Sequence, residues 1–293
     1  MCLAGLAMSL TLYEAAFTAI REFEREAFRR SITTLSLVGG FASTLFWPLT
    51  HALLSWGSWR STLVCFATLQ LLICLPLHLA LPGHNADPRE LAGDQPAGAE
   101  QASGLLRSPV FWALSLALFA ASMFSGAVSA HAAGLLKHQQ VSESVMLWSM
   151  GLFGPMQVVG RLLDLGWGNR LPLKWTGGLA FAGFPVAMLL LSLCHNGQPW
   201  AFAFSCVYGM ANGVLTIVSG LAPAEMLGSY PYAQSLGWLS GFGMLARALA
   251  PALGALMLTW AGPGFTMIAL ALVGVVGLLS FEAACRAASK QTA

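Results

Sequence analysis

Apolar blocks of about 20 residues limit the fold of this chain more than any other feature of its sequence. At a rise of about 1.5 Å per residue, a helix of that length crosses the hydrocarbon core of a bilayer. Only 9% of the residues are charged, whereas about a quarter are charged in soluble domains. The blocks lack the strict alternation of strands in a membrane barrel. The sequence therefore predicts an all-α polytopic membrane protein.

Nine such blocks predict nine transmembrane helices. We expect them near residues 2–20, 32–54, 62–81, 109–136, 145–165, 175–194, 200–221, 236–260 and 265–285. The interval 82–107 is rich in Gly, Pro, Ala and acidic residues, as solvated linkers are. The predicted organisation is a partial three-helix bundle (1–81), a cytoplasmic linker (82–107) and a six-helix bundle (108–293).

The distribution of Lys and Arg predicts the orientation, because these residues accumulate in cytoplasmic loops. If the linker is cytoplasmic, Arg60 and Lys137 are external, Arg247 lies inside a span, and all other Lys and Arg residues are cytoplasmic. Met1 is then external and the C-terminus cytoplasmic. The first span has no basic residue before it and REFEREAFRR after it, unlike a signal peptide. We therefore expect the chain to begin inside a longer protein.

Several functional classes find no support in the sequence. It contains no C-x-x-C, no H-E-x-x-H and no G-x-x-x-x-G-K motif, so we expect no metal site, no cofactor and no nucleotide hydrolysis by the chain itself. The net charge of +2 forms no basic stripe between aromatic residues, so no nucleic-acid partner is predicted. No obligate protein partner is indicated, and the expected surroundings are a lipid bilayer.

Two pairs of predicted spans resemble one another at a nearly constant offset. Residues 5–7 (Gly-Leu-Ala) resemble residues 209–211 (Gly-Met-Ala), 204 positions later. Gly40 and Pro48 are eight residues apart in the second span, and the eighth span repeats this spacing 203 positions later. Parallel repeats of transporters leave this kind of signal. The repeat pairs the first predicted span with the seventh and the second with the eighth.

Three stretches resemble a bacterial branch of the major facilitator superfamily: LYEAAF, RRSITTLSLVGGFASTLFWPLTHALLSWGSWR and GPMQVVGRLLD. The spans correspond in order to helices four to twelve of the family's twelve, with the linker as its central cytoplasmic loop. Gly160-x-x-x-Asp164 is similar to the family's cytoplasmic loop motif, although Leu165 stands where a basic residue is usual.

The resemblance implies secondary active transport of a small solute by alternating access in a bacterial inner membrane, driven by a solute or proton gradient, and no enzymatic activity. Two alternatives stay open. One is the membrane subunit of a multi-component permease with a separate ATPase. The other is an intramembrane enzyme, which would need clustered acids, histidines or a nucleophile on facing helices.

Polar side chains inside spans are the candidates for substrate binding, because an ionisable group in a bilayer costs at least about 2–3 kcal/mol. They are Arg247, Asn212, Gln157 and His131. Arg247 is predicted to bind an anionic group, which makes a small organic anion the preferred substrate; alternatively it caps carbonyls freed by Pro251. The other three could instead be packing residues with hydrogen bonds between helices.

Four further residues are candidates for coupling or gating: Glu14, Arg161, Asp164 and Glu225. Glu14 lies near the cytoplasmic end of the first span, where it could alternatively pair with the neighbouring arginines. The other three could form a cytoplasmic latch between the two halves, or a solvated loop face. The glycine pairs Gly209/Gly213 and Gly237/Gly241 predict close approaches between helices.

Overall fold

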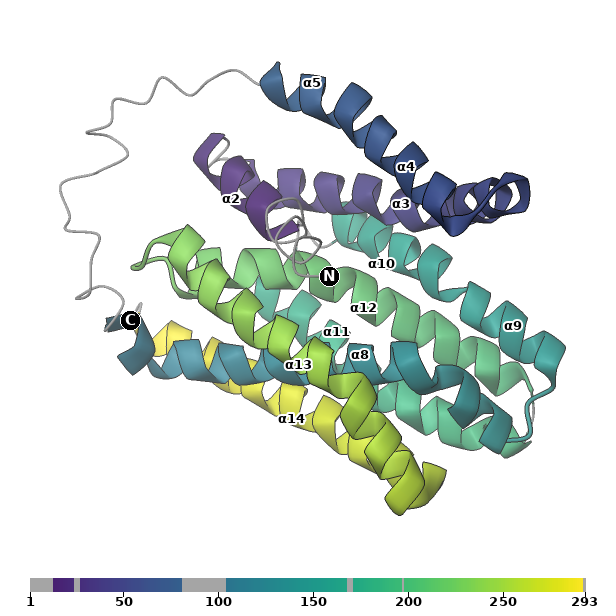
Figure 1. Ribbon diagram of the computed structural model, residues 1–293. Coiled ribbons are helices and arrows are strands. Elements are labelled where there is room, and N and C mark those ends of the chain that lie inside the picture. Colours follow the sequence, from purple (N-terminus) through teal and green to yellow (C-terminus); the bar gives the residue numbers. More distant parts are fainter. Residues whose placement is uncertain (1–12, 24–26, 81–103, 168–170, 197, 292–293) are drawn as a thin grey trace. The chain divides into compact units, whose positions relative to one another are not determined.

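The computed structural model describes residues 13–23, 27–80, 104–167, 171–196 and 198–291. These residues form helices and no strands, which confirms the predicted all-α class. The α-helices are α2 (Tyr13–Phe23), α3 (Phe28–Trp56), α4 (Trp59–Leu69), α5 (Leu75–Leu79), α8 (Pro109–His138), α9 (Glu143–Gly151), α10 (Phe153–Trp167), α11 (Leu173–Ser192), α12 (Pro199–Met226), α13 (Tyr232–Trp260) and α14 (Gly262–Gln291) (Figure 1). A π-helical turn (Gln70–Cys74) joins α4 to α5, and a 3₁₀ turn (Leu193–Asn196) follows α11.

Six helical stretches of the described chain are long and apolar enough to cross a membrane: Trp59–Leu79, Pro109–His138, Leu173–His195, Pro199–Met226, Tyr232–Trp260 and Gly262–Lys290. Each coincides with a predicted span. The first predicted span lies mostly outside the described residues, and the second corresponds to α3. The fifth is divided at Leu152 into α9 and α10. The total of nine stays a prediction.

The chain divides into two compact units, Met1–Gly40 with Ala102–Ala293, and Phe41–Gln101. The boundary falls inside α3, whereas the predicted organisation has its boundaries at the linker; that organisation stays a prediction. In the second unit, Ser58 and Ser61 form a capping box that begins α4. The rings of Phe46 and Phe66 meet edge to face there, with centroids 5.7 Å apart.

The larger unit is a bundle in which α8 packs along both α13 and α14 (Figure 1). α11 packs along α12 and α14, and α10 packs along α12. Small residues set the register of α8 and α13. A Cβ added at Gly126 of α8 would lie 2.8 Å from Cβ of Ala250, and one added at Gly243 of α13 would lie 3.1 Å from Oγ of Ser122. Residue numbers rise together along this contact, so the two helices are parallel.

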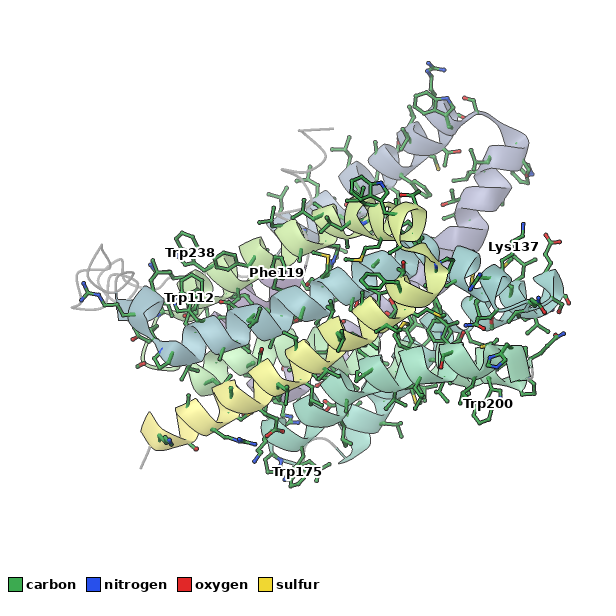
Figure 2. The ribbon with its side chains drawn as sticks, turned by 90° about the horizontal axis from the view of Figure 1, so that it is seen from below. Trp112, Phe119, Lys137, Trp175, Trp200 and Trp238 are labelled. Carbon is green, nitrogen blue, oxygen red and sulfur yellow. The ribbon has the colours of Figure 1, made fainter. Side chains whose placement is uncertain are left out.

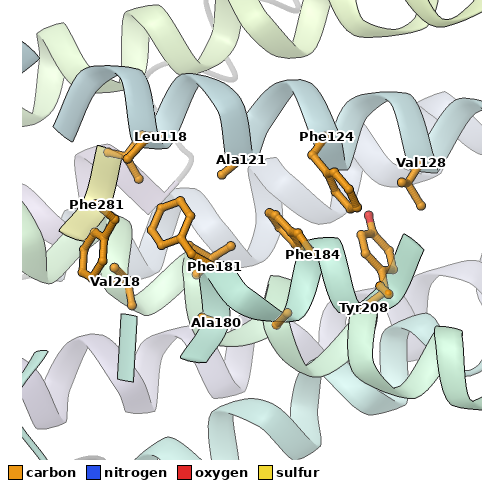
Figure 3. Close-up of a cluster of buried hydrophobic side chains, with 14 of the residues drawn as sticks. Leu118, Ala121, Phe124, Val128, Ala180, Phe181, Phe184, Tyr208, Val218 and Phe281 are labelled. Carbon is orange, nitrogen blue, oxygen red and sulfur yellow. The ribbon is translucent and has the colours of Figure 1, made fainter. Parts of the chain in front are cut away.

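Aromatic side chains fill the core between α8, α11, α12 and α14 (Figure 3). The rings of Phe124 and Phe184 stack with centroids 4.3 Å apart, next to Tyr208. Phe181 and Phe281 stack in the same way at 4.9 Å. Stacked rings gain energy beyond the burial of their area. They fix these four helices to one another and hold the polar faces described below in place.

Glycines bring the backbones of α10 and α12 close together. A Cβ added at Gly209 would lie 2.9 Å from the carbonyl oxygen of Phe153, and one added at Gly213 would lie 2.8 Å from Cα of Gln157. The close approach predicted for this glycine pair is confirmed. The prediction for Gly237 and Gly241 is wrong within the described structure, because a Cβ at either would meet no atom within 4 Å.

Exposed tryptophans mark both ends of the larger unit. Trp112 and Trp238 lie at one end, and Trp200 lies with Lys137 at the other (Figure 2). Phe242 contacts the first two, with ring centroids 5.9 Å from Trp112 and 6.5 Å from Trp238. Tryptophan is enriched at both membrane interfaces, where an apolar ring and a polar N–H each find a suitable environment. This arrangement fits a bundle whose long axis crosses the bilayer.

Candidate functional site

A cavity of about 710 Å³ lies among α2, α8, α10, α12 and α13 of the larger unit. Five of the residues predicted from the sequence line it: Glu14, Gln157, Arg161, Asn212 and Arg247. The charged side chains of its described lining are one carboxylate and two guanidinium groups. The cavity therefore carries a net positive charge when Glu14 is ionised.

Three serines of α8 form a polar wall that sequence reasoning missed. Ser122, Ser125 and Ser129 all line the cavity. Their spacing of three and four residues places them on one face of the helix. This spacing in an otherwise apolar helix was the signal that could have identified them. Tyr13, Thr216, Ser219 and Ser240 add further hydroxyl groups from α2, α12 and α13.

Asn212 connects this wall to α10 through a chain of polar contacts. The hydroxyl of Ser125 donates a hydrogen bond to Oδ1 of Asn212 over 2.9 Å. One turn further along α12, the hydroxyl of Thr216 donates to the backbone carbonyl of Asn212 over 3.2 Å. Thr216 Oγ1 in turn accepts from Nη2 of Arg161 at 3.4 Å. With Oδ1 of Asn212 occupied, its amide NH₂ is the group left to donate toward a ligand.

Arg161 is buried although its guanidinium lacks most of its hydrogen bonds. Its exposed fraction is 3%, and Nε and Nη1 have no hydrogen-bond partner among the described residues. A Cβ on Gly40 would overlap Nη1, so the glycine of α3 makes room for the guanidinium. This burial is unlike a solvated loop face, the alternative considered for this residue. A buried cation without a partner costs several kcal/mol, on the order of 3–5 kcal/mol when a pair is broken.

Arg247 lies on the opposite side of the polar chain, on α13. A Cβ added at Gly126 would lie 3.5 Å from Cα of Arg247 and 3.3 Å from its carbonyl oxygen, so the backbones of α8 and α13 nearly touch there. Pro251, four residues later, has no N–H to bond that carbonyl. The Arg247 side chain is exposed and lines the cavity. Among the described residues, its guanidinium caps no carbonyl.

His131 was also predicted to bind substrate, but the structure places it at a contact between helices. Its Nε2 lies 2.9 Å from the carbonyl oxygen of Pro251, and a Cβ on Gly254 would lie 2.6 Å from its Cδ2. It is absent from the described lining of the cavity. The geometry matches the packing alternative, in which the ring joins α8 to α13.

Two of the three predicted latch residues, Asp164 and Glu225, interact electrostatically with the same cation, Arg29. Asp164 is 5% exposed and lies 3.7 Å from Nη2 of Arg29, at the start of α3, with Thr33 Oγ1 3.5 Å away. Arg29 Nη1 also donates to the carbonyl of Leu171 over 3.1 Å. Arg161 faces the cavity instead, and Glu225 is exposed at the end of α12. Sequence reasoning missed Arg29 as the partner of Asp164.

Membrane-length helices around a charged polar cavity define a polytopic membrane protein of the transporter class. Within the described ranges, no three His, Cys, Asp or Glu side chains gather as metal ligands would. The family model of the Major Facilitator Superfamily matches residues 1–230. The chain therefore belongs to the Major Facilitator Superfamily, which confirms the resemblance found in the sequence. A search of curated proteins found no match.

This membership makes the chain a multi-pass membrane protein and a secondary transporter of small solutes. Members of the family are transporters rather than enzymes. Polar groups from five helices of the described chain face the cavity.

Proposed function

We propose that this transporter carries a small organic anion and binds it in the cavity through Arg247. The observation that carries the proposal is the charge of the lining, with two guanidinium groups against one carboxylate. Arginine stays protonated when buried, because its pKa is far above any physiological pH. A carboxylate is the ligand that a guanidinium binds best, through two parallel hydrogen bonds.

The uncharged lining supports an anion as well. The amide NH₂ of Asn212, the amide of Gln157 and the serine hydroxyl groups of α8 can all donate hydrogen bonds. Donors outnumber the carboxylate oxygens of Glu14, the one acidic side chain of the described lining. A cationic solute would meet one carboxylate and two like charges, so the anion is favoured.

Transport in this proposal follows alternating access, in which two halves rock around a central site. Glu14 lines the cavity and is the candidate for coupling to protons. The Arg29–Asp164 contact between α3 and α10 is the candidate gate. Breaking it would leave Asp164 buried without its cation, so the closed contact is favoured until substrate binding compensates. We place the protein in a bacterial inner membrane with a cytoplasmic C-terminus.

Substitution of Arg247 tests the proposal. With butyrate as the probe and the purified chain in lipid nanodiscs, Arg247→Ala should weaken binding at least about 30-fold, because the charge-assisted hydrogen bonds to the carboxylate are lost. Arg247→Lys should keep part of the affinity, since it retains the charge without the planar fork. The matched control is Arg60→Ala, which removes an exposed arginine that stacks on Trp59. Unchanged butyrate binding by a folded Arg247→Ala variant would contradict the proposal.

A further inference from the structure

Arg161, the second arginine of the cavity, has no acidic partner within 4.0 Å among the described residues, and its position points to a second anionic group on the substrate. We infer that the cavity takes a small organic dianion, with one carboxylate at Arg247 and the other at Arg161. The inference rests on the proposed function and narrows it from organic anions to dicarboxylates. It is carried by the burial of Arg161 and its lack of hydrogen bonds, and by its place on the same cavity as Arg247.

The two arginines reach the cavity from different walls. Arg161 belongs to α10, which packs along α12, and Arg247 belongs to α13, which packs along α8. The backbone of Arg247 lies at Gly126, next to Ser125, whose hydroxyl bonds Asn212. Arg161 donates a hydrogen bond to Thr216, which lies one turn of α12 beyond Asn212. Along the axis of α12, Thr216 and Asn212 are therefore about one helical pitch, or about 5.4 Å, apart. A single carboxylate would engage one arginine, whereas a molecule with two separated carboxylates would engage both.

No acidic side chain of the described residues forms an ion pair with Arg161. Within the described part of the chain, the one ion pair within 4.0 Å is Arg29–Asp164, so Glu14 makes no such contact with either cavity arginine. Nε and Nη1 of Arg161 remain without acceptors, and its one side-chain bond goes to a neutral hydroxyl. Since a desolvated cation is stabilised chiefly by an opposite charge, a second substrate carboxylate supplies what the fold leaves out.

The experiment compares two probes of equal carbon number, succinate and butyrate, in binding titrations of the 293-residue chain in nanodiscs. We expect succinate to bind about tenfold or more tightly than butyrate in the wild-type chain. Arg161→Gln should reduce succinate affinity about tenfold and butyrate affinity by a smaller factor, about threefold or less, because succinate loses a direct partner whereas butyrate loses only part of the positive charge of the lining. Arg161→Lys should keep most of the preference, because it keeps the charge. Arg60→Gln, an exposed control, should change neither affinity.

The thermal midpoint of the ligand-free protein supplies an independent readout. Arg161→Gln removes an unpaired buried charge, so its Tm should equal or exceed that of the wild type. A lower Tm, with equal losses of succinate and butyrate binding, would mean that Arg161 is a structural residue and would overturn the inference.

The two proposals fail in different ways. If butyrate binds as tightly as succinate and Arg247→Gln abolishes both, the dianion inference falls and the organic anion stands. If Arg247→Gln changes neither affinity, or the wild-type chain binds neither probe, the proposed function falls and takes the inference with it.

Discussion

Helices α8 and α13 lie side by side in parallel and have nearly the same length and hydropathy, yet they are buried to very different extents. α8 has 30 residues, and an apolar stretch of 18 residues within it has a mean hydropathy of 1.7 and is 56% buried. α13 has 29 residues, and the corresponding stretch of 18 residues has a mean hydropathy of 1.5 and is only 22% buried. Apolar character is therefore enough to place a helix in a membrane, but it does not decide how many neighbours the helix has.

The positions of small residues account for the difference. In lipid, helices associate through close packing rather than through a hydrophobic driving force. α8 packs against α13 on one side and α14 on another, with Gly126 against α13 and Ala120 near Gly277 of α14. α13 uses Gly243 and Gly254 for its contact with α8, while Gly237 and Gly241 touch nothing within 4 Å in the described structure. Arg247 lies beside the contact with α8, and its side chain lines the cavity.

Because α8 and α13 are parallel, their first residues should lie on the same side of the membrane. Both should begin on the cytoplasmic side, as the distribution of basic residues indicates. In a cysteine-free background, a membrane-impermeant maleimide added to intact cells should label Ser142→Cys, which follows α8. It should label neither Ser103→Cys, before α8, nor Gly228→Cys, before α13. Permeabilised cells provide the control, in which all three positions should react. Labelling of only one of the last two positions in intact cells would mean that the helices are not parallel in the membrane.

The unequal burial predicts unequal costs of truncating one large side chain on each helix. Phe124 of α8 is fully buried and stacks on Phe184, whereas Leu249 of α13 is 42% exposed. Phe124→Ala should lower the free energy of unfolding by about 3 kcal/mol, because it opens a cavity between helices. Leu249→Ala should change it by less than about 0.5 kcal/mol. Unfolding titrations in mixed detergent micelles measure both values, and similar losses at the two positions would refute the contrast.

Leucine substitutions at one glycine of each helix test the same difference in packing between α8 and α13, with a smaller expected change in stability. Gly126→Leu should cost about 1–3 kcal/mol, since even a Cβ there meets Ala250 at 2.8 Å. Gly237→Leu, in open space on α13, should be neutral or stabilise by up to about 1 kcal/mol through its higher helix propensity. The same titrations provide the measurement. A cost at Gly237 equal to that at Gly126 would show that a neighbour covers this face of α13.

The sequence predicted the features that depend on composition and failed where packing decides. The apolar blocks were sufficient for the all-α class, and the cost of charge in lipid drew attention to Arg247 and Glu14, which line the cavity. His131 is also an ionisable side chain inside a predicted span. Its ring, however, makes a hydrogen-bond contact with the carbonyl of Pro251, 120 residues later in the chain, and does not line the cavity in the described structure. No local pattern could show this.

Other misses have the same cause. Asp164 pairs with Arg29 through a contact between α3 and α10, and the residues next to Asp164 in the sequence give no sign of this contact. Arg161 was predicted to share a cytoplasmic latch with Asp164, yet the two side chains face different surroundings. The spacing of the α8 serines indicates a polar face of that helix. This face was overlooked in the sequence because single hydroxyl groups are common in membrane helices.

The break at Leu152 has a consequence for how the protein is made. α9 has nine residues and α10 has 15, and α10 contains both Arg161 and Asp164. Segments this short and this charged partition poorly into lipid when they leave the translocon alone. α12 packs against this stretch, with Gly209 and Gly213 close to the α10 backbone and Thr216 accepting a hydrogen bond from Arg161. Because α12 is synthesised later, we expect α9 and α10 to enter the bilayer together with α12 rather than alone.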